Sequence, residues 1–237
     1  MKKFYLLLVA CIFAFILFYI GMSNGNKDGF IEMESYIGGE EGEQFDFCLN
    51  YFCKGRPMEG KTIKSIQFPE CEKMKNTFSM EYVSRQKWYG IYAVTLSVIF
   101  PETGTYSVKK IVIQYEDNTT KEYDVGSIFF DIDEKNNQDD WIDTWSSPAA
   151  SSNKEEFTFD YKLKNASVKI KKIIYGENEI LEDSDGISPN SAIELTGDAP
   201  IKIIRPKIIV EYKGEEQTYY GMPCNCGALD VDSSVLP

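Results

Sequence analysis

The strongest constraint on the fold is a period-two alternation of apolar and polar residues, which begins at residue 45. Successive side chains of a strand point to opposite faces of a sheet, so this pattern indicates strands with one buried face. No long stretch with the 3.6-residue period of an amphipathic helix competes with it, although residues 71–85 could hold a helical turn. The side chains expected on buried faces are Phe45, Phe47, Leu49, Tyr51, Tyr92, Val94, Leu96, Val98, Phe100, Ile111, Ile113, Tyr115, Tyr123, Val125, Phe157, Phe159, Tyr161, Leu163, Val168, Ile170, Ile193, Leu195, Ile208, Val210 and Tyr212.

The two halves of this region also resemble each other. The matched segments, in chain order, are 43–47 with 155–159, 63–70 with 170–177, and 110–115 with 207–212. The separation between partners shrinks along the chain, as expected if the first copy has a longer middle section. The pattern predicts a tandem duplication, and the alternative is two unrelated strand-rich segments.

Many short alternating strands with polar turns predict an all-β fold, namely two tandem immunoglobulin-like β-sandwich domains after an N-terminal transmembrane or signal helix. The predicted order is a signal anchor or signal peptide (1–22), a first sandwich (30–133), an acidic and Ser-rich linker (134–154), a second sandwich (155–222) and a Cys-containing tail (223–237).

One short motif adds to this prediction. Gly104-Thr105-Tyr106 stands just before a predicted strand and resembles the tyrosine corner of immunoglobulin-like domains. Together with the size of the two halves, this motif means that the chain resembles bacterial immunoglobulin-like and fibronectin-like surface modules at the level of fold. The second copy has Ile203 at the corresponding place, and no Cys lies near 111–115 to form an antibody-type disulfide with the strand at 45–51.

Residues 4–22 contain no charged side chain and follow the pair Lys2-Lys3. At about 1.5 Å per residue, a helix of this length nearly spans a hydrocarbon core of about 30 Å. The lysines place the N-terminus in the cytoplasm and the rest of the chain outside. Three alternatives remain open: an uncleaved anchor, a signal peptide cut near residues 21–23, and a lipoprotein anchored at Cys11, which ends a lipobox-like run.

Charge and composition exclude several classes of function. The net charge is −12 and there is no His. An anionic chain is unsuited to binding the phosphate backbone of nucleic acids or anionic lipid headgroups. The absence of His excludes His-dependent catalytic triads and His-ligated zinc.

Signals for catalysis are weak. Ser84 and Lys87 have the spacing of a Ser-x-x-Lys dyad, but a solvated turn is the simpler interpretation. Trp141 and Trp145 between the domains could stack on sugars, yet buried residues that wedge the domains together are favoured. We therefore predict no enzyme, no catalytic, cofactor-binding or metal residues and no cofactor.

The predicted function is a membrane-anchored or exported protein with a binding or structural role towards a protein or cell-wall ligand. The alternatives are a secreted hydrolase or accessory subunit that uses carboxylates alone, and an envelope sensor or assembly factor. Contact with the membrane is expected through residues 4–22, and none with nucleic acid.

The cysteines support a disulfide hypothesis. Cys48 and Cys53 point to opposite faces of one predicted strand, so they cannot bond each other. An oxidising exterior favours a bridge from Cys71 to one of them. Cys224-Asn225-Cys226 could instead contribute to a zinc site, and the further alternative is five independent thiols.

The acidic run 131–140 suggests one more hypothesis. Its carboxylates and amides are the oxygen ligands that Ca²⁺ prefers. Lys135 interrupts the spacing of a calcium loop and would repel the ion, so a solvated spacer is the favoured interpretation.

Overall fold

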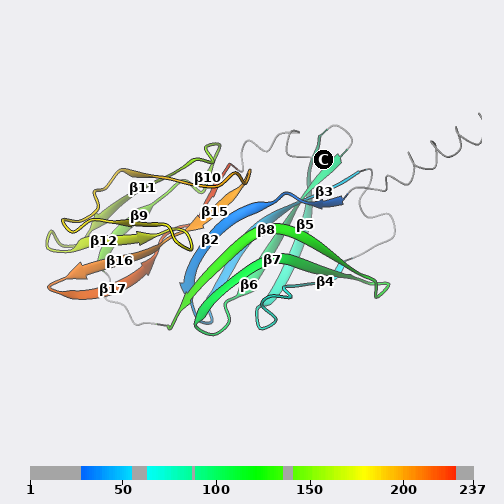
Figure 1. The fold of residues 1–237 in the computed structure, drawn as a ribbon, viewed down its shortest axis with the longest axis horizontal. Coiled ribbons are helices and arrows are strands. Elements are labelled where there is room, and N and C mark those ends of the chain that lie inside the picture. The colour runs from blue at the N-terminus through cyan, green and yellow to red at the C-terminus, as the bar shows by residue number, and fades with distance from the viewer. Residues whose placement is uncertain (1–27, 55–62, 87–88, 136–140, 228–237) are drawn as a thin grey trace, which may run out of the picture.

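The computed structural model of the protein describes residues 28–54, 63–86, 89–135 and 141–227. Every regular element in these ranges is a β-strand, which confirms the all-β prediction. The strands form two lobes that lie end to end along the longest axis (Figure 1). In the described part of the chain, no helix has the length and apolar character needed to cross a membrane. The predicted leader at 4–22 lies outside that part.

The first lobe consists of two facing sheets. One has the strand order β1-β3-β6-β5, and the other contains β2-β8-β7-β4. Their bounds are β1 Asp28–Phe30, β2 Met33–Glu40, β3 Gln44–Lys54, β4 Ile63–Gln67, β5 Lys75–Gln86, β6 Tyr89–Ile99, β7 Gly104–Tyr115 and β8 Thr120–Asp133.

This strand order is that of an immunoglobulin constant-type sandwich. Such a domain places strands A, B, E and D in one sheet and C, F and G in the other. In this chain, β1-β3-β6-β5 corresponds to the A-B-E-D sheet, and β4-β7-β8 corresponds to the C-F-G sheet. Strand β2 is an addition that pairs parallel with β8. Tyr106 lies near the start of the F-like strand, and its hydroxyl donates to the Glu102 carbonyl at 2.8 Å. That contact is the hydrogen bond of a tyrosine corner, as its sequence suggested.

The second lobe also has two sheets, with orders β14-β11-β9 and β13-β12-β16-β17. The bounds are β9 Ile142–Ser146, β11 Glu156–Leu163, β12 Lys169–Ile174, β13 Ile180–Glu182, β14 Ser191–Glu194, β16 Lys207–Tyr212 and β17 Glu215–Tyr220. Strand β9 therefore lies inside the segment 134–154 that the sequence suggested as a linker.

The two lobes share an arrangement of strands that follows the sequence matches. In the first, β4 pairs antiparallel with β7, which forms a hairpin with β8. In the second, β12 pairs antiparallel with β16, which forms a hairpin with β17. A register irregularity lies between Ile63 and Ser65 in one lobe and between Ile170 and Lys172 in the other. Those two irregularities occupy matched positions of the sequence repeat.

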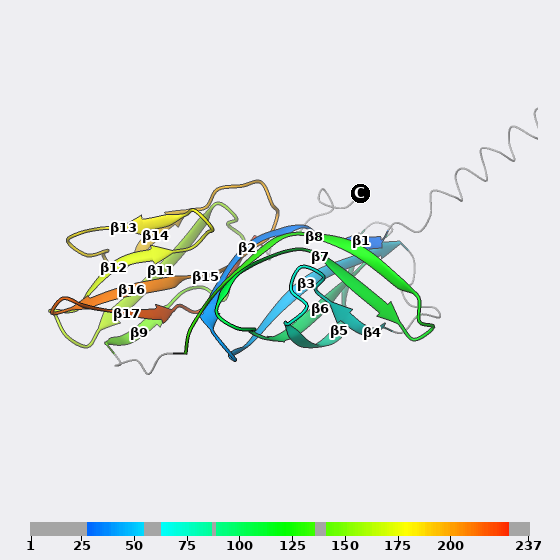
Figure 2. The same cartoon turned by 60° about the horizontal axis from the view of Figure 1, so that its bottom comes forward.

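A shared sheet joins the lobes. Strand β15 (Lys202–Arg205) pairs parallel with β2 of the first lobe, and β18 (Cys224–Cys226) and β10 (Ala150–Ser151) extend the sheet beyond it. After Pro206, which lacks an N–H to continue a ladder, the chain enters β16 in a sheet of the second lobe. Figure 2 shows β15 between the lobes. Segment 223–237, expected to be a tail, therefore contributes a strand to this sheet.

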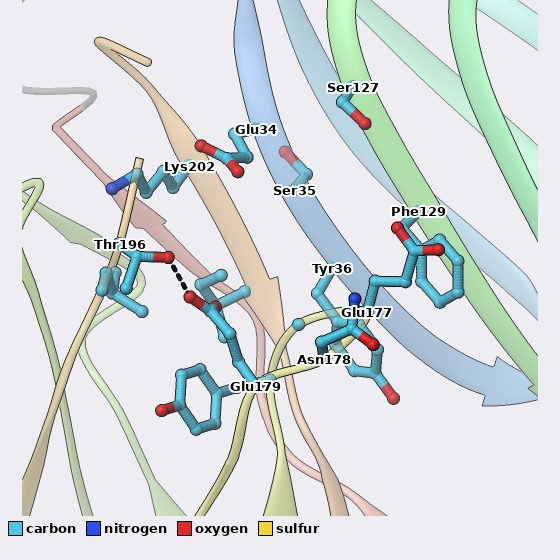
Figure 3. A pocket seen from close by; sticks show the side chains of 14 residues that line it. Glu34, Ser35, Tyr36, Ser127, Phe129, Glu177, Asn178, Glu179, Thr196 and Lys202 are labelled. Carbon is cyan, nitrogen blue, oxygen red and sulfur yellow. Dashed lines mark hydrogen bonds between the residues drawn. The ribbon is translucent and has the colours of Figure 1, made fainter. Parts of the chain in front are cut away.

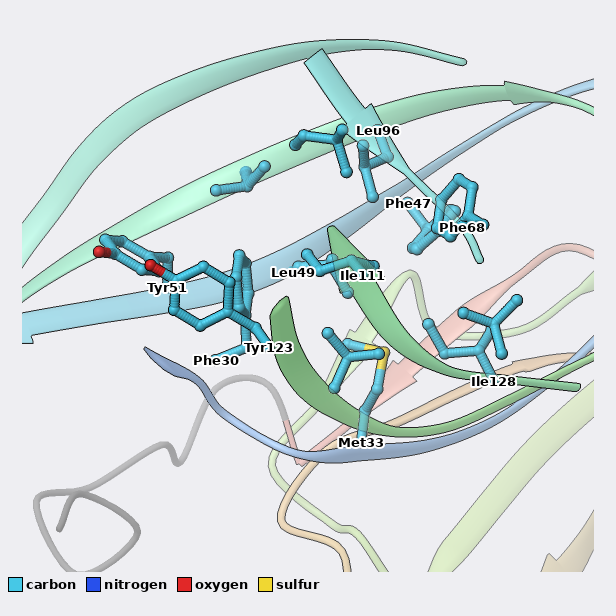
Figure 4. Close-up of a cluster of buried hydrophobic side chains, with 14 of the residues drawn as sticks. Phe30, Met33, Phe47, Leu49, Tyr51, Phe68, Leu96, Ile111, Tyr123 and Ile128 are labelled. Atoms are coloured by element: carbon cyan, nitrogen blue, oxygen red, sulfur yellow. The ribbon is translucent and has the colours of Figure 1, made fainter. Parts of the chain in front are cut away.

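The period-two alternation of apolar and polar residues correctly predicted most of the buried core residues. The first core fills the space between the first lobe's sheets, where Phe47, Leu49 and Leu96 face Ile111 and Ile128 (Figure 4). The second core surrounds Phe157, Ile170 and Ile208. Of the expected buried set, Tyr92, Tyr161, Leu163 and Tyr212 are only partly buried.

The helical turn suggested for residues 71–85 is wrong. The chain makes a hydrogen-bonded turn from Phe68 to Met74 and then enters the long edge strand β5. The alternation is hard to recognise there because β5 is largely exposed: Phe78 and Met80 are half-buried, and Tyr82 and Val83 are exposed.

Candidate functional site

The proposed Ser-x-x-Lys dyad falls only partly within the described residues. Ser84 lies on the edge strand β5, and its proposed partner Lys87 falls outside the described residues. Two adjacent glycines, Gly38 and Gly39, belong to β2, where close neighbours take the space of a side chain: a Cβ on Gly39 would lie 2.0 Å from the Phe100 ring.

Both linker tryptophans belong to the second lobe. Trp145 stacks on Phe159 with ring centroids 5.0 Å apart, and it also stacks on Tyr161. Trp141 packs edge-on against Tyr212 at 5.5 Å. The two rings therefore do not form the expected wedge between the domains: their ring contacts are all with side chains of the second lobe, and both rings pack against the second core.

The expected bridge from Cys71 to Cys48 or Cys53 is absent, because all five described cysteines are free thiols. Cys53 lies opposite Gly90 on β6, whereas Cys71 precedes Lys75, which lies opposite Ile99. At about 3.3 Å per residue, the nine positions from 90 to 99 place these cysteines near opposite ends of the sheet. As predicted, Cys53 points into the core, while Cys48 is half-exposed on the other face.

Two acids of the calcium hypothesis have other partners. Lys207 Nζ lies 2.7 Å from Asp133 and 3.5 Å from Asp131. The Tyr36 hydroxyl donates to Asp131 at 2.7 Å, and the Tyr220 hydroxyl donates to Asp133. Burial raises the pKa of Tyr36 and Tyr220, and the negative charge of the neighbouring carboxylates raises it further. Both tyrosine hydroxyls therefore stay protonated and remain hydrogen-bond donors. These contacts join β8 of the first lobe to β16 and β17 of the second.

A second polar contact reinforces the junction. Arg205, at the end of β15, makes two parallel hydrogen bonds to Glu43, with Nη1–Oε2 at 2.9 Å and Nη2–Oε1 at 2.6 Å. Its guanidinium also lies over the rings of Phe45 and Tyr220. A bidentate contact of this kind fixes the orientation of the guanidinium relative to the carboxylate as well as the distance between them.

Beside this junction lies a pocket of about 280 Å³ that both lobes line. One wall comes from the shared sheet: Ser35 and Tyr36 on β2, Ser127 and Phe129 on β8, and Lys202 and Ile204 on β15. The other wall comes from the second lobe, with Tyr175, Gly176, Glu177, Asn178, Glu179, Leu195 and Thr196. Figure 3 shows these two walls facing each other, and Glu34 of β2 also lines the pocket.

The polar side chains of the pocket differ in how firmly they are held. Lys202 is only 2% exposed and donates from Nζ to the Gly197 carbonyl at 3.0 Å. Ser35 is buried and accepts a hydrogen bond from the Ile203 backbone N–H at 3.1 Å, so it ties β2 to β15. Thr196 donates to Glu179, and both side chains line the pocket. Glu34 and Glu177 are exposed.

The pocket is therefore a small, acidic recess. It carries three carboxylates against one ammonium group, and that ammonium is already engaged by a carbonyl. Such a lining can accept hydrogen bonds from amines and hydroxyls. In the described residues, no group of three or more Cys, Asp or Glu side chains is placed to hold a metal ion.

The sequence did not point to these pocket residues. Glu177 and Glu179 lie in the loop after a predicted strand, and Lys202 precedes an apolar run, so their local patterns resemble those of ordinary surface residues. The parallel pairing of β15 with β2 brings Lys202 to the same wall as Ser35 and Tyr36.

Comparisons with known proteins give little further guidance. No protein-family model and no curated protein sequence matches the chain. Similar solved structures include the D00-D0 domain of intimin, with 9% identity and a TM-score of 0.26 over 84% of this chain and 99% of that one. Fibronectin(III)-like modules of CbhA from Clostridium thermocellum show 8% identity and a TM-score of 0.23 over 84% and 94%.

A third similar structure is the sialic acid binding region of a Streptococcus sanguinis SK1 adhesin, with 13% identity and a TM-score of 0.24 over 73% of this chain and 48% of that one. TM-scores this low establish neither a common fold nor a common function. The assignment of the first lobe to the immunoglobulin type rests on its own strand order.

Proposed function

We propose that this protein is a non-enzymatic binding protein outside the cytoplasmic membrane, which holds a protein or cell-wall ligand in the pocket between two tandem immunoglobulin-like domains. The observation that carries the proposal is the composition of the pocket, whose two walls come from different lobes. Ligand sites occur preferentially at such domain junctions. The matched strands and register irregularities of the lobes support their origin by duplication.

Pocket size and charge define the class of ligand. At about 280 Å³ the recess lies just below the range of about 300–1,000 Å³ that suits a drug-sized molecule. It fits one projecting group of a larger partner, such as an amine-bearing side chain or a single sugar. Glu34, Glu177 and Glu179 favour a cationic or hydroxyl-rich group there.

A binding comparison tests the proposal. The full-length chain in detergent is immobilised and incubated with cell-wall fragments and surface-protein extracts. We expect the Glu177→Gln/Glu179→Gln variant to lose binding by roughly tenfold or more, since each lost charge-assisted hydrogen bond costs about 1.5–3 kcal/mol. The control variant Glu215→Gln/Glu216→Gln changes two exposed glutamates of β17 outside the pocket. Equal binding by the two variants would rule out the pocket as the ligand-binding site.

Export is a separate part of the proposal. The uncharged segment 4–22 and the lysines before it support a membrane anchor or a signal peptide. A reporter enzyme that is active only outside the cytoplasm, fused after residue 237, should be active. Protease added to spheroplasts should digest the lobes, whereas full protection would contradict export.

The acidic pocket also favours one alternative, a hydrolase that uses carboxylates. Glycosidases place two carboxyl groups on either side of the scissile bond. Chromogenic glycosides offered to the wild type and to Glu177→Gln/Glu179→Gln distinguish the two functions. Turnover by the wild type that the variant loses would favour the hydrolase, and binding without turnover supports the proposal.

A further inference from the structure

Cys224 and Cys226 form a close pair of thiols on one face of β18. Their Sγ atoms are 3.4 Å apart, with the Cys226 thiol donating to the Cys224 sulfur. Residues two apart in a strand project to the same side of a sheet, which explains why the thiols meet. The expected bridge involved Cys71, but this pair is the one that the fold brings together.

The pair lies at the join between the lobes. Both side chains are buried in the second core, and β18 pairs with β15 on one side and with β10 on the other. Cys226 lies opposite Lys202, a buried residue of the pocket wall. Strand β18 has only three residues, and so short a strand opens more readily than the long strands of the first lobe.

We propose that Cys224 and Cys226 are a redox-active dithiol that closes to an intrastrand disulfide by exchange with a small disulfide oxidant when β18 opens. This inference goes beyond the proposed binding function and does not depend on the ligand of the pocket.

The reaction balances as two successive thiol–disulfide exchanges. The Cys224 thiolate attacks one sulfur of the oxidant, forms a mixed disulfide and releases one thiolate. Cys226 then loses its proton and attacks the Cys224 sulfur, which releases the second thiolate and closes the ring. The protein loses two electrons and two protons, and the oxidant is reduced to two thiols.

The local chemistry assigns the order of attack. The hydrogen bond from Cys226 lowers the pKa of the Cys224 thiol, although burial opposes this effect. The same hydrogen bond, together with burial, raises the pKa of Cys226. Cys224 is therefore the attacking sulfur and Cys226 the resolving one.

Closing the disulfide changes the strand. In an extended strand, Cα atoms two residues apart are separated by about 6.6 Å, which exceeds the most common separation across disulfides, about 5.5–6 Å. The bond therefore shortens β18 and weakens its ladders with β15 and β10. The redox state thus affects the sheet that joins the lobes.

Peptide mapping of the full-length chain in detergent tests the proposal. The protein is equilibrated with glutathione at several ratios of oxidised to reduced form, quenched with acid, denatured and alkylated. Trypsin cleaves after Lys213 and releases a peptide, residues 214–237, that contains Cys224 and Cys226 as its only cysteines. With excess oxidised glutathione, this peptide should be 2 Da lighter and take no alkyl group. Cys71 and the peptide 28–54, which holds Cys48 and Cys53, should still be alkylated.

Two variants identify the roles of the sulfurs. Cys226→Ser removes the resolving thiol, so Cys224 should accumulate the glutathione adduct to roughly ten times the wild-type level. Cys48→Ser is the matched control and should leave closure of the peptide 214–237 unchanged. Two alkylatable thiols in this peptide at every ratio, or a glutathione adduct that never resolves in the wild type, would overturn the proposal.

Discussion

Asp28 is a carboxylate that binds three side chains at the start of β1. The hydroxyls of Tyr51 and Tyr123 donate to it at 2.8 and 2.6 Å, and Lys121 forms an ion pair with it. Burial favours the neutral acid, but the hydrogen bonds from Lys121, Tyr123 and Tyr51 outweigh that effect and hold the pKa of Asp28 below its ordinary value. A carboxyl group whose pKa is lower in the folded state stabilises the fold above its unfolded pKa of about 3.9.

We therefore predict that Asp28→Asn lowers the free energy of unfolding at pH 7 by about 1–3 kcal/mol. The deficit should shrink as the pH falls below about 4, because the wild-type carboxylate then becomes protonated and loses the same contribution. Urea titrations between pH 7 and pH 3 measure both effects. Asp46→Asn, at an exposed position of β3, is the control and should change stability by less than about 0.5 kcal/mol. A deficit independent of pH would contradict this account.

Gly39 carries a steric prediction. A Cβ at this position would lie 2.0 and 2.6 Å from two ring carbons of Phe100, a side chain that is only 2% exposed. Gly39→Ala should therefore destabilise the fold by about 1–3 kcal/mol, the usual cost of overpacking a core. At Gly38 the nearest atoms are 3.1 Å and further away, so Gly38→Ala should cost less.

A double-mutant cycle checks the steric cause. Phe100→Leu reduces the ring, so the combined Gly39→Ala/Phe100→Leu variant should lose less stability than the sum of the two single variants. Additive losses would show that Phe100 is not the obstacle.

At the scale of the element, the sequence predicted strands well and their sheets only in part. Alternation identifies which side chains of β3 and β6 are buried, because one face of each strand packs on the core. It does not identify β15 as a strand of the first lobe's sheet, because parallel pairing with β2 joins residues more than 160 positions apart. The pocket depends on that pairing, so its residues could not be found from local patterns.

A truncation tests the importance of β18. Ending the chain after Met222 removes the strand, the two buried cysteines and the backbone partners of β15 and β10. We expect the free energy of unfolding to fall by about 3–5 kcal/mol, from lost burial and from unpaired backbone groups at the new edge. Ending the chain after Gly227 keeps the strand and serves as the control. Equal stability of the two truncated chains would show that β18 contributes little to the join.

At the scale of the whole molecule, the lobes are coupled more tightly than two domains on a linker would be. The second core includes Tyr36 from β2, and the first includes Ile201 and Ile203 from the sequence of the second half. Arg205 and Lys207 pair with carboxylates of the first lobe. Neither core is complete without residues from the other half of the chain, so the lobes should unfold together.

We predict a single unfolding transition for the full-length chain. In a Trp88→Phe background, the remaining tryptophans are Trp141 and Trp145, so fluorescence reports on the second lobe, whereas far-UV circular dichroism reports on strands in both. The two midpoints in urea should coincide, as they do for a two-state protein. Replacing Lys207 with Met leaves Asp131 and Asp133 without their cation, and should lower the common midpoint or split it into two. Two separate midpoints in the Trp88→Phe chain itself would mean that the shared sheet does not couple the lobes.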